Sequence, residues 1–252
     1  MWDIIQEKLD EIERRENVII LHCVESGSRA WGFASPDSDY DVRFIYVRPL
    51  EYYLRLEPTR DVIEWQLDDT LDINGWDLQK ALRLLHRSNP TLFEWYNSPI
   101  VYRTTPQWKQ IAEHMEKYFS EKSSLYHYLS TAKSNYREYL KGKEVKLKKY
   151  FYVLRPLLAC KWIVERQTPP PMLFESLADA CLEEKIRPEV DRLLELKRNT
   201  SELGLGKRID VINEYLDHSI EEMEQIIKEL PNSKEKNWTE LNDIFLEIVK
   251  NV

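Results

Sequence analysis

The sequence predicts an α+β N-terminal domain, in which helices flank a small mixed sheet, followed by an all-helical C-terminal domain. Two observations support this prediction. Short runs of β-branched and aromatic residues alternate with helical patterns as far as about Thr105. Beyond that point nearly every segment up to Val252 has helical periodicity, interrupted by prolines and glycines. The predicted domains are therefore residues 1–105 and 106–252.

The N-terminal elements follow from the spacing of apolar residues. A first helix is predicted from Trp2 to about Arg15. Strands are predicted at residues 18–24, 42–47, 62–67 and 71–73. Asn74 is expected to cap the next helix, with Asp77 as its approximate capping-box partner. That helix is expected to end near residues 88–90, where a Ser-Asn-Pro sequence occurs.

Composition narrows the class of protein. Six glycines among 252 residues are too few for the tight turns of a large β-sandwich. No apolar run is long enough to cross a bilayer, and the acidic, amphipathic N-terminus does not resemble a secretory signal. The three cysteines, Cys23, Cys160 and Cys181, form no C-x-x-C pair. We therefore expect a cytoplasmic protein with reduced thiols.

Charge is unevenly distributed along the chain. The net charge is -8, yet the segment from Lys133 to Arg166 has ten Lys or Arg residues and three Glu, a local balance of +7. Tyrosines are interleaved with these lysines. A solvated helix face explains most such runs, but a surface that contacts phosphates and stacks on bases is the alternative. Lys149 and Arg155 are the residues expected to make such contacts.

The most informative stretch runs from Gly27 to Val47 and reads GSRAWGFASPDSDYDVRFIYV. A strand ends at Gly27-Ser28, a spacer of ten residues follows, and Asp39 and Asp41 enter the next strand. Glycine permits close approach of the backbone to a ligand, and the serine amide and hydroxyl can hold a phosphate. Carboxylates two residues apart on an extended chain face the same side, where a cation relieves their repulsion. The pattern therefore predicts a Mg²⁺–phosphate site rather than a polar turn.

This arrangement is similar to the nucleotidyltransferase superfamily of DNA polymerase β, whose signature is Gly-Ser or Gly-Gly, a spacer and Asp-x-Asp. The longer string resembles the predicted YcgL-like, or RNA-ligase-associated, members of that superfamily. Residues 89–102 and 148–163 also look like stretches of this group. The resemblance implies a polymerase-β-like catalytic domain and transfer of a nucleoside monophosphate with release of pyrophosphate. It also implies two Mg²⁺ ions, for which Mn²⁺ could substitute.

Members of this superfamily usually have a third carboxylate on a neighbouring strand. Asp72 is expected to fill this role, because it lies on the presumed strand just before the helix cap. Glu64 is the main alternative. Asp68 and Asp69 are interpreted as turn residues, and Asp77 as an acid in the first turn of the next helix. The expected catalytic residues and metal ligands are thus Asp39, Asp41 and Asp72.

Several residues are expected to bind the nucleotide. Arg43 could brace the triphosphate or pair with the aspartates, and Arg29 could reach a phosphate or form a structural salt bridge. Ser38 could cap its loop or touch the phosphates. The expected nucleotide-binding residues are Gly27, Ser28, Arg29, Ser38, Arg43, Lys149 and Arg155.

The sequence leaves the acceptor open. An RNA end is favoured because of the basic segment, but a protein hydroxyl or a small molecule of the aminoglycoside type is also compatible with the motif. A non-catalytic module that binds nucleotide or RNA is the alternative from another class. No P-loop string, G-x-S-x-G elbow or zinc-ligand spacing occurs, so these chemistries are not expected. The oligomeric state is not predicted.

Overall fold

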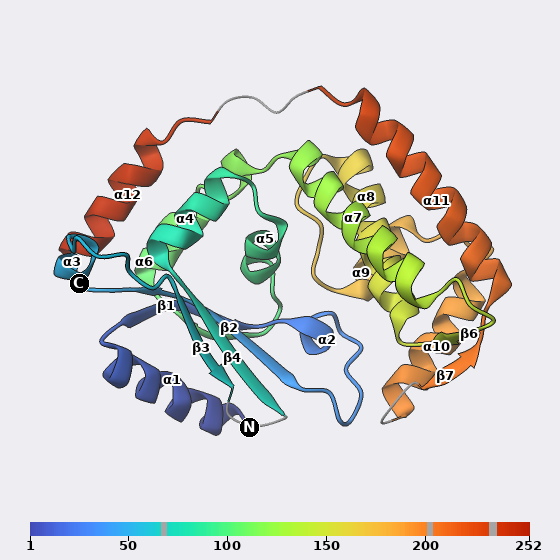
Figure 1. Ribbon diagram of the computed structural model, residues 1–252, viewed down its shortest axis with the longest axis horizontal. Coiled ribbons are helices and arrows are strands. Elements are labelled where there is room, and N and C mark those ends of the chain that lie inside the picture. The colour runs from blue at the N-terminus through green and yellow to red at the C-terminus, as the bar shows by residue number, and fades with distance from the viewer. Residues whose placement is uncertain (67–69, 201–203, 232–235) are drawn as a thin grey trace. The chain divides into compact units, whose positions relative to one another are not determined.

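The computed structural model describes residues 1–66, 70–200, 204–231 and 236–252 (Figure 1). The chain forms two compact units, each built from separate stretches of sequence. Unit 1 comprises Met1–Ala30, Asp39–Phe119 and Glu235–Val252. Unit 2 comprises Trp31–Ser38 and Ser120–Lys234. The sequence instead predicts one boundary near Thr105.

Unit 1 is built on a five-stranded mixed sheet with the strand order β3-β4-β2-β1-β5. Its strands are β1 (Ile19–Glu25), β2 (Tyr40–Val47), β3 (Val62–Gln66), β4 (Leu71–Asp77) and β5 (Val101–Thr104). Only the β2–β4 pair is parallel, and the other pairs are antiparallel. The interior strand β1, which lies between β2 and β5, is buried at six consecutive positions, in agreement with its continuous apolar sequence.

Helices cover both faces of this sheet. On one face lies α1 (Trp2–Glu16), whose Ile5, Leu9 and Ile12 are completely buried in the core beneath the sheet. The other core includes residues of α4 (Leu78–His86), α5 (Pro90–Tyr96), α6 (Pro106–Ala112) and α12 (Thr239–Lys250). Short helical turns complete the unit: α2 (Gly27–Ala30), α3 (Leu50–Tyr53) and η1 (Glu116–Tyr118). The predicted small mixed sheet with flanking helices is confirmed.

The predicted start of the α4 helix is wrong. Asn74 lies within β4, where it is opposite Arg43 of β2 and Glu64 of β3. Because pairing on both sides keeps the backbone extended, the strand continues to Asp77. The Asp77 carboxylate then caps α4 by accepting the backbone N–H of Gln79 at 2.7 Å. Both residues are good capping residues, and strand pairing selects the second.

In its described residues, unit 2 is mainly helical and has one two-stranded sheet, of β6 (Glu144–Lys146) and β7 (Leu205–Lys207). Its helices are α7 (Glu121–Tyr139), α8 (Lys149–Arg166), α9 (Phe174–Cys181), α10 (Arg187–Asn199) and α11 (Asp210–Glu229). The α8 helix lies at the centre, with eleven buried residues including Pro156. The Asn213 side chain is buried against it and accepts the Tyr150 hydroxyl at 2.6 Å. Helical segments thus dominate the C-terminal half, as predicted.

Within the described residues, no helix is long and apolar enough to cross a membrane. The three cysteines are free thiols, and Cys23 and Cys160 are buried.

Candidate functional site

The Gly27 turn lies at the end of β1, against the start of β2. Gly27 has a φ of 57°, in the left-handed region that glycine adopts readily. The backbone N–H of Ser26 donates to the Asp41 carbonyl at 2.8 Å, which fixes the turn beside β2. A Cβ atom at Gly27 would lie 2.0 Å from Asp41 Oδ2. Glycine therefore leaves room for the carboxylate in this position, and any side chain here would force it to move.

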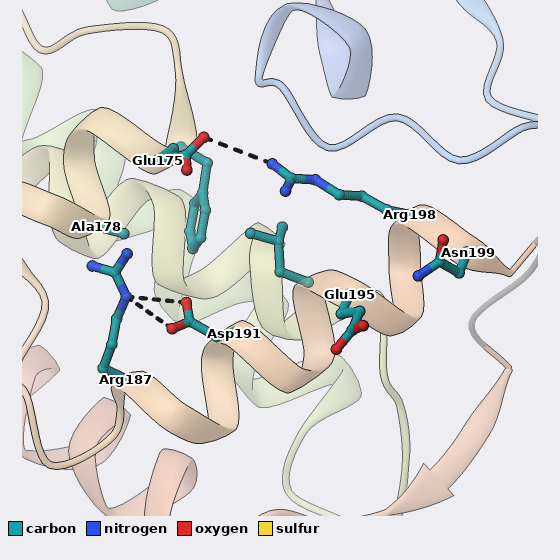
Figure 2. Close-up of a pocket in the computed structure, with 9 residues that line it drawn as sticks. Glu175, Ala178, Arg187, Asp191, Glu195, Arg198 and Asn199 are labelled. Atoms are coloured by element: carbon teal, nitrogen blue, oxygen red, sulfur yellow. Dashed lines mark hydrogen bonds and ion pairs between the residues drawn. The ribbon is translucent and has the colours of Figure 1, made fainter.

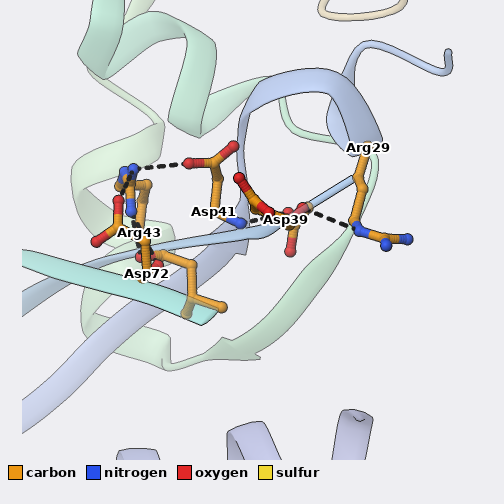
Figure 3. Close-up of polar contacts among 7 residues, drawn as sticks. Arg29, Asp39, Asp41, Arg43 and Asp72 are labelled. Carbon is orange, nitrogen blue, oxygen red and sulfur yellow. Dashed lines mark hydrogen bonds and ion pairs between the residues drawn. The ribbon is translucent and has the colours of Figure 1, made fainter. Parts of the chain in front are cut away.

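Asp39 and Asp41 flank the first residue of β2. Asp39 is exposed, and its backbone carbonyl accepts Arg29 Nε–H at 3.0 Å (Figure 3). The Arg29 guanidinium lies 3.7 Å from the centre of the Tyr40 ring, so this arginine braces the entry to the strand. Its expected phosphate contact stays a prediction. The Asp41 side chain is about one-third exposed, at 32%.

Parallel pairing of β2 with β4 sets Asp72 directly opposite Asp41. The Arg43 guanidinium lies between the two carboxylates, with Nη2 2.9 Å from Asp41 Oδ1 and 2.7 Å from Asp72 Oδ2 (Figure 3). Burial raises the pKa of Asp41; Arg43 opposes this shift, whereas the charges of Asp72 and Asp39 add to it. The structure therefore brings together Asp39, Asp41, Arg43 and Asp72 at the edge of the Gly27 turn.

The alternative third carboxylate, Glu64, lies farther from Asp41. It is exposed on the edge strand β3, opposite Asn74 and level with Arg43 rather than with Asp41. One strand separates it from β2. The geometry thus favours Asp72, although its role remains a prediction. Asp68 and Asp69 lie outside the described residues.

Sequence reasoning missed Glu25, the last residue of β1. Glu25 is completely buried, and its Oε1 accepts the backbone N–H of Asp41 at 2.8 Å. Its other oxygen accepts the Tyr102 hydroxyl at 2.5 Å. Burial raises the pKa of Glu25, and these two hydrogen bonds oppose the shift. A glutamate that ends an apolar strand two residues before Gly27-Ser28 is the signal that could have identified it.

Of the remaining predicted residues, Ser28 lies in α2 of unit 1, and Ser38, Lys149 and Arg155 lie in unit 2. Ser38 accepts the backbone N–H of Ser35 through its hydroxyl at 2.9 Å, which is a turn-capping contact. Lys149 Nζ lies 4.2 Å from the Tyr139 ring centre and 4.6 Å from that of Tyr152. Arg155 is 3% exposed. Arg155 donates to the Met172 carbonyl at 3.4 Å and stacks on Trp31 at 4.7 Å.

The carboxylates of Asp39 and Asp41 fit a magnesium ion, because hard carboxylate oxygens are the ligands that Mg²⁺ prefers. The space between Asp41 and Asp72, in contrast, is filled by the Arg43 guanidinium. In the described part of the chain, no three His, Cys, Asp or Glu side chains converge as they would around a metal ion. A cation held by Asp39 and Asp41 stays a prediction.

Unit 2 has a small pocket between α9 and α10 (Figure 2). Both arginines on its rim pair with carboxylates of the same unit. Arg187 contacts Asp191 at 3.0 Å, and Arg198 lies 3.8 Å from Glu175. This pocket therefore has its charges compensated internally.

The chain is similar to proteins of one family along nearly its whole length. A model of the RNA repair pathway DNA polymerase beta family matches residues 1–247. The chain is 48% identical over 252 residues to the uncharacterized protein YcgL of Bacillus subtilis (strain 168), with 98% of this chain and 96% of that protein covered. A crystal structure of a nucleotidyltransferase-like protein from Exiguobacterium sibiricum 255-15 matches with a TM-score of 0.32 and 12% identity. That match covers 98% of this chain and 80% of the other.

Proposed function

Because the chain belongs to the RNA repair pathway DNA polymerase beta family, we propose that it is a Mg²⁺-dependent nucleotidyltransferase. It transfers a nucleoside monophosphate from an NTP to a hydroxyl group. The observation that carries this proposal is the register of β2 and β4, which sets Asp72 opposite Asp41 beside the Gly27 turn. An NTP donor is consistent with the cytoplasmic location that the sequence predicts.

In the proposed reaction, the backbone at Gly27 and Ser28 binds the triphosphate, and Asp39 and Asp41 hold the cation. The bound Mg²⁺ supplies positive charge to the phosphates. The acceptor oxygen forms a bond to the α-phosphorus, and the bond from the α-phosphorus to the bridging oxygen breaks, so pyrophosphate leaves. Asp72, whose side chain is 47% exposed, accepts the proton of the attacking hydroxyl.

Label transfer tests this proposal. The protein is incubated with each α-³²P-labelled NTP, Mg²⁺ or Mn²⁺, and either total RNA, the protein alone or a cell lysate. The paired variant Asp39→Ala, Asp41→Ala is compared with Asp37→Ala, which removes another exposed aspartate of the same segment. We expect label with the wild type and with Asp37→Ala, and none with the paired variant. Absence of label in every arm, with NTP still bound, would instead indicate a binding module.

RNA is the acceptor that the surface of unit 2 favours. A lysine–tyrosine cluster in this unit consists of Tyr139, Lys146, Lys149 and Tyr152. Lys146 Nζ lies 5.3 Å from the Tyr139 ring centre. Burial lowers the pKa of Lys149, the neighbouring charges of Lys148 and Lys146 lower it further, and Glu138 opposes them. An anion therefore stabilises the charged form of this lysine. Single-stranded RNA offers phosphates for the lysines and bases for the tyrosine rings.

Fluorescence anisotropy with a labelled single-stranded RNA tests the acceptor class separately from catalysis. Lys149→Ala is compared with Lys185→Ala, an exposed lysine elsewhere in unit 2. We expect Lys149→Ala to weaken binding by about tenfold and to reduce the salt dependence by about one phosphate contact. Equal affinity of the two variants would point to a protein or small-molecule acceptor.

A further inference from the structure

Arg43 is held at the site by four hydrogen bonds. Its Nη2 donates to Asp41 Oδ1 at 2.9 Å and to Asp72 Oδ2 at 2.7 Å. Its Nη1 donates to the backbone carbonyls of Val42 at 3.0 Å and Asp72 at 3.1 Å. Only 18% of the Arg43 side chain is exposed. Four acceptors on two adjacent strands thus fix the position of the guanidinium.

This position is the one that a cation would take between two opposed carboxylates. Asp41 and Asp72 face each other in register, and paired carboxylates repel each other unless a positive charge lies between them. Arginine stays protonated at any physiological pH, and its planar group can serve both carboxylates at once. The chain therefore supplies that positive charge from its own sequence.

A metal ion and the guanidinium cannot occupy this space together. Magnesium binds carboxylate oxygens at about 2.0–2.1 Å, well inside the 2.9 and 2.7 Å contacts of Arg43. An ion bound to the same oxygens of Asp41 and Asp72 would thus displace Arg43 Nη2 from both carboxylates. An ion held by Asp39 and the free side of Asp41 requires no such change.

We propose that Arg43 takes the place of a second metal ion, so that the site binds one divalent cation, on Asp39 and Asp41. The proposal rests on the proposed function, in that the cation belongs to the nucleotidyl-transfer site. Asp72 is then held by Arg43 and is not a metal ligand. Two metal ions, which the family resemblance implies, are not needed to neutralise the three aspartates.

Counting bound Mn²⁺ tests this inference without any measurement of transfer. Free Mn²⁺ is followed by electron paramagnetic resonance during titration of the nucleotide-free protein at millimolar concentrations. We expect one Mn²⁺ per chain for the wild type, two for Arg43→Gln, and one again for the double variant Arg43→Gln, Asp72→Asn. Arg43→Lys, which keeps the positive charge, should also bind one.

Arg103→Gln is the matched control. Arg103 also bridges two carboxylates, with Nη2 2.7 Å from Asp10 and Nη1 3.0 Å from Glu13, and its side chain is 23% exposed. It lies on β5, two strands from β2, and should leave the count at one. Circular dichroism establishes that each variant is folded. If Arg43→Gln does not fold, the wild-type and Arg43→Lys counts still decide the matter.

A wild-type count of zero or two, or an Arg43→Gln count of one, overturns the inference. These results are distinguishable from failure of the proposed function. If label transfer occurs but two ions bind, nucleotidyl transfer stands and the single-cation inference fails. If one ion binds but no label is transferred under any condition, the role of Arg43 stands and the proposed reaction fails.

Discussion

Replacing Gly27 with alanine has different expected effects on the stability of the fold and on nucleotidyl transfer at the site. Gly27 has a φ of 57°, and an alanine held in that left-handed conformation costs about 1–2 kcal/mol. The added Cβ would lie 2.0 Å from Asp41 Oδ2 and 2.9 Å from its Cγ, far inside van der Waals contact. Because this carboxylate ends a short rotatable side chain, it can move away. Its movement, however, breaks the ion pair with Arg43.

We therefore expect Gly27→Ala to have a small effect on stability and a large effect on transfer. Urea unfolding should show a loss of about 1–2 kcal/mol in unfolding free energy. Label transfer should decrease by at least about 100-fold, since an ångström of misplacement is enough for such a loss. Gly204→Ala is the control, because a Cβ at Gly204 meets nothing within 4 Å. Transfer by Gly27→Ala at the wild-type rate would refute this reasoning.

Three further predictions concern single side chains. Asp72→Asn should reduce label transfer by about 100-fold or more, and Glu64→Gln by less than about threefold, because only Asp72 is in register with Asp41; equal losses would contradict this assignment. Burial raises the pKa of Asp77 from 3.8 to about 6. Between these pH values the folded protein binds more protons than the unfolded chain does. The unfolding free energy therefore falls as the pH rises, by about 3 kcal/mol at most. In urea unfolding from pH 4 to 7, Asp77→Asn should remove this part of the dependence, and an unchanged profile would count against it. Arg155→Ala should lower the unfolding free energy by about 2–3 kcal/mol, because the side chain is buried on Trp31; a fully stable variant that has lost NTP binding would support the nucleotide contact instead.

Local patterns were sufficient to predict the small mixed sheet and flanking helices of unit 1. The apolar run of β1 and the strand after Asp41 have the composition of buried strands, and both form. The family expected from residues 27–47 is confirmed by the match over residues 1–247. These features are predictable because each depends on residues that are close together in the sequence.

Features that depend on register could not be predicted in the same way. Whether Asn74 or Asp77 caps α4 is decided by how far β4 stays paired with its two neighbours. The partner of Arg43 could not be predicted either, because an arginine can pair with a triphosphate or with the aspartates. Only the parallel pairing of β2 with β4 sets Asp72 within 2.7 Å of the guanidinium. Glu25 was missed because a buried glutamate at a strand end has no signature until its partners, Asp41 and Tyr102, are known.

The spacer of the Gly-Ser and Asp-x-Asp motif is itself a structural element of unit 2. Trp31 and Phe33 lie in this spacer, which a motif search treats as variable. Phe33 packs against Phe151 at 4.9 Å between ring centres and against Phe174 at 5.6 Å. Lys197 donates to the Ser35 hydroxyl at 3.0 Å. Since Ala30 and Asp39 belong to unit 1, the chain enters unit 2 and returns between the predicted phosphate-binding turn and the predicted cation ligands. Large aromatic residues inside a loop of ten residues were the signal for this, because a solvated spacer has no reason to contain them.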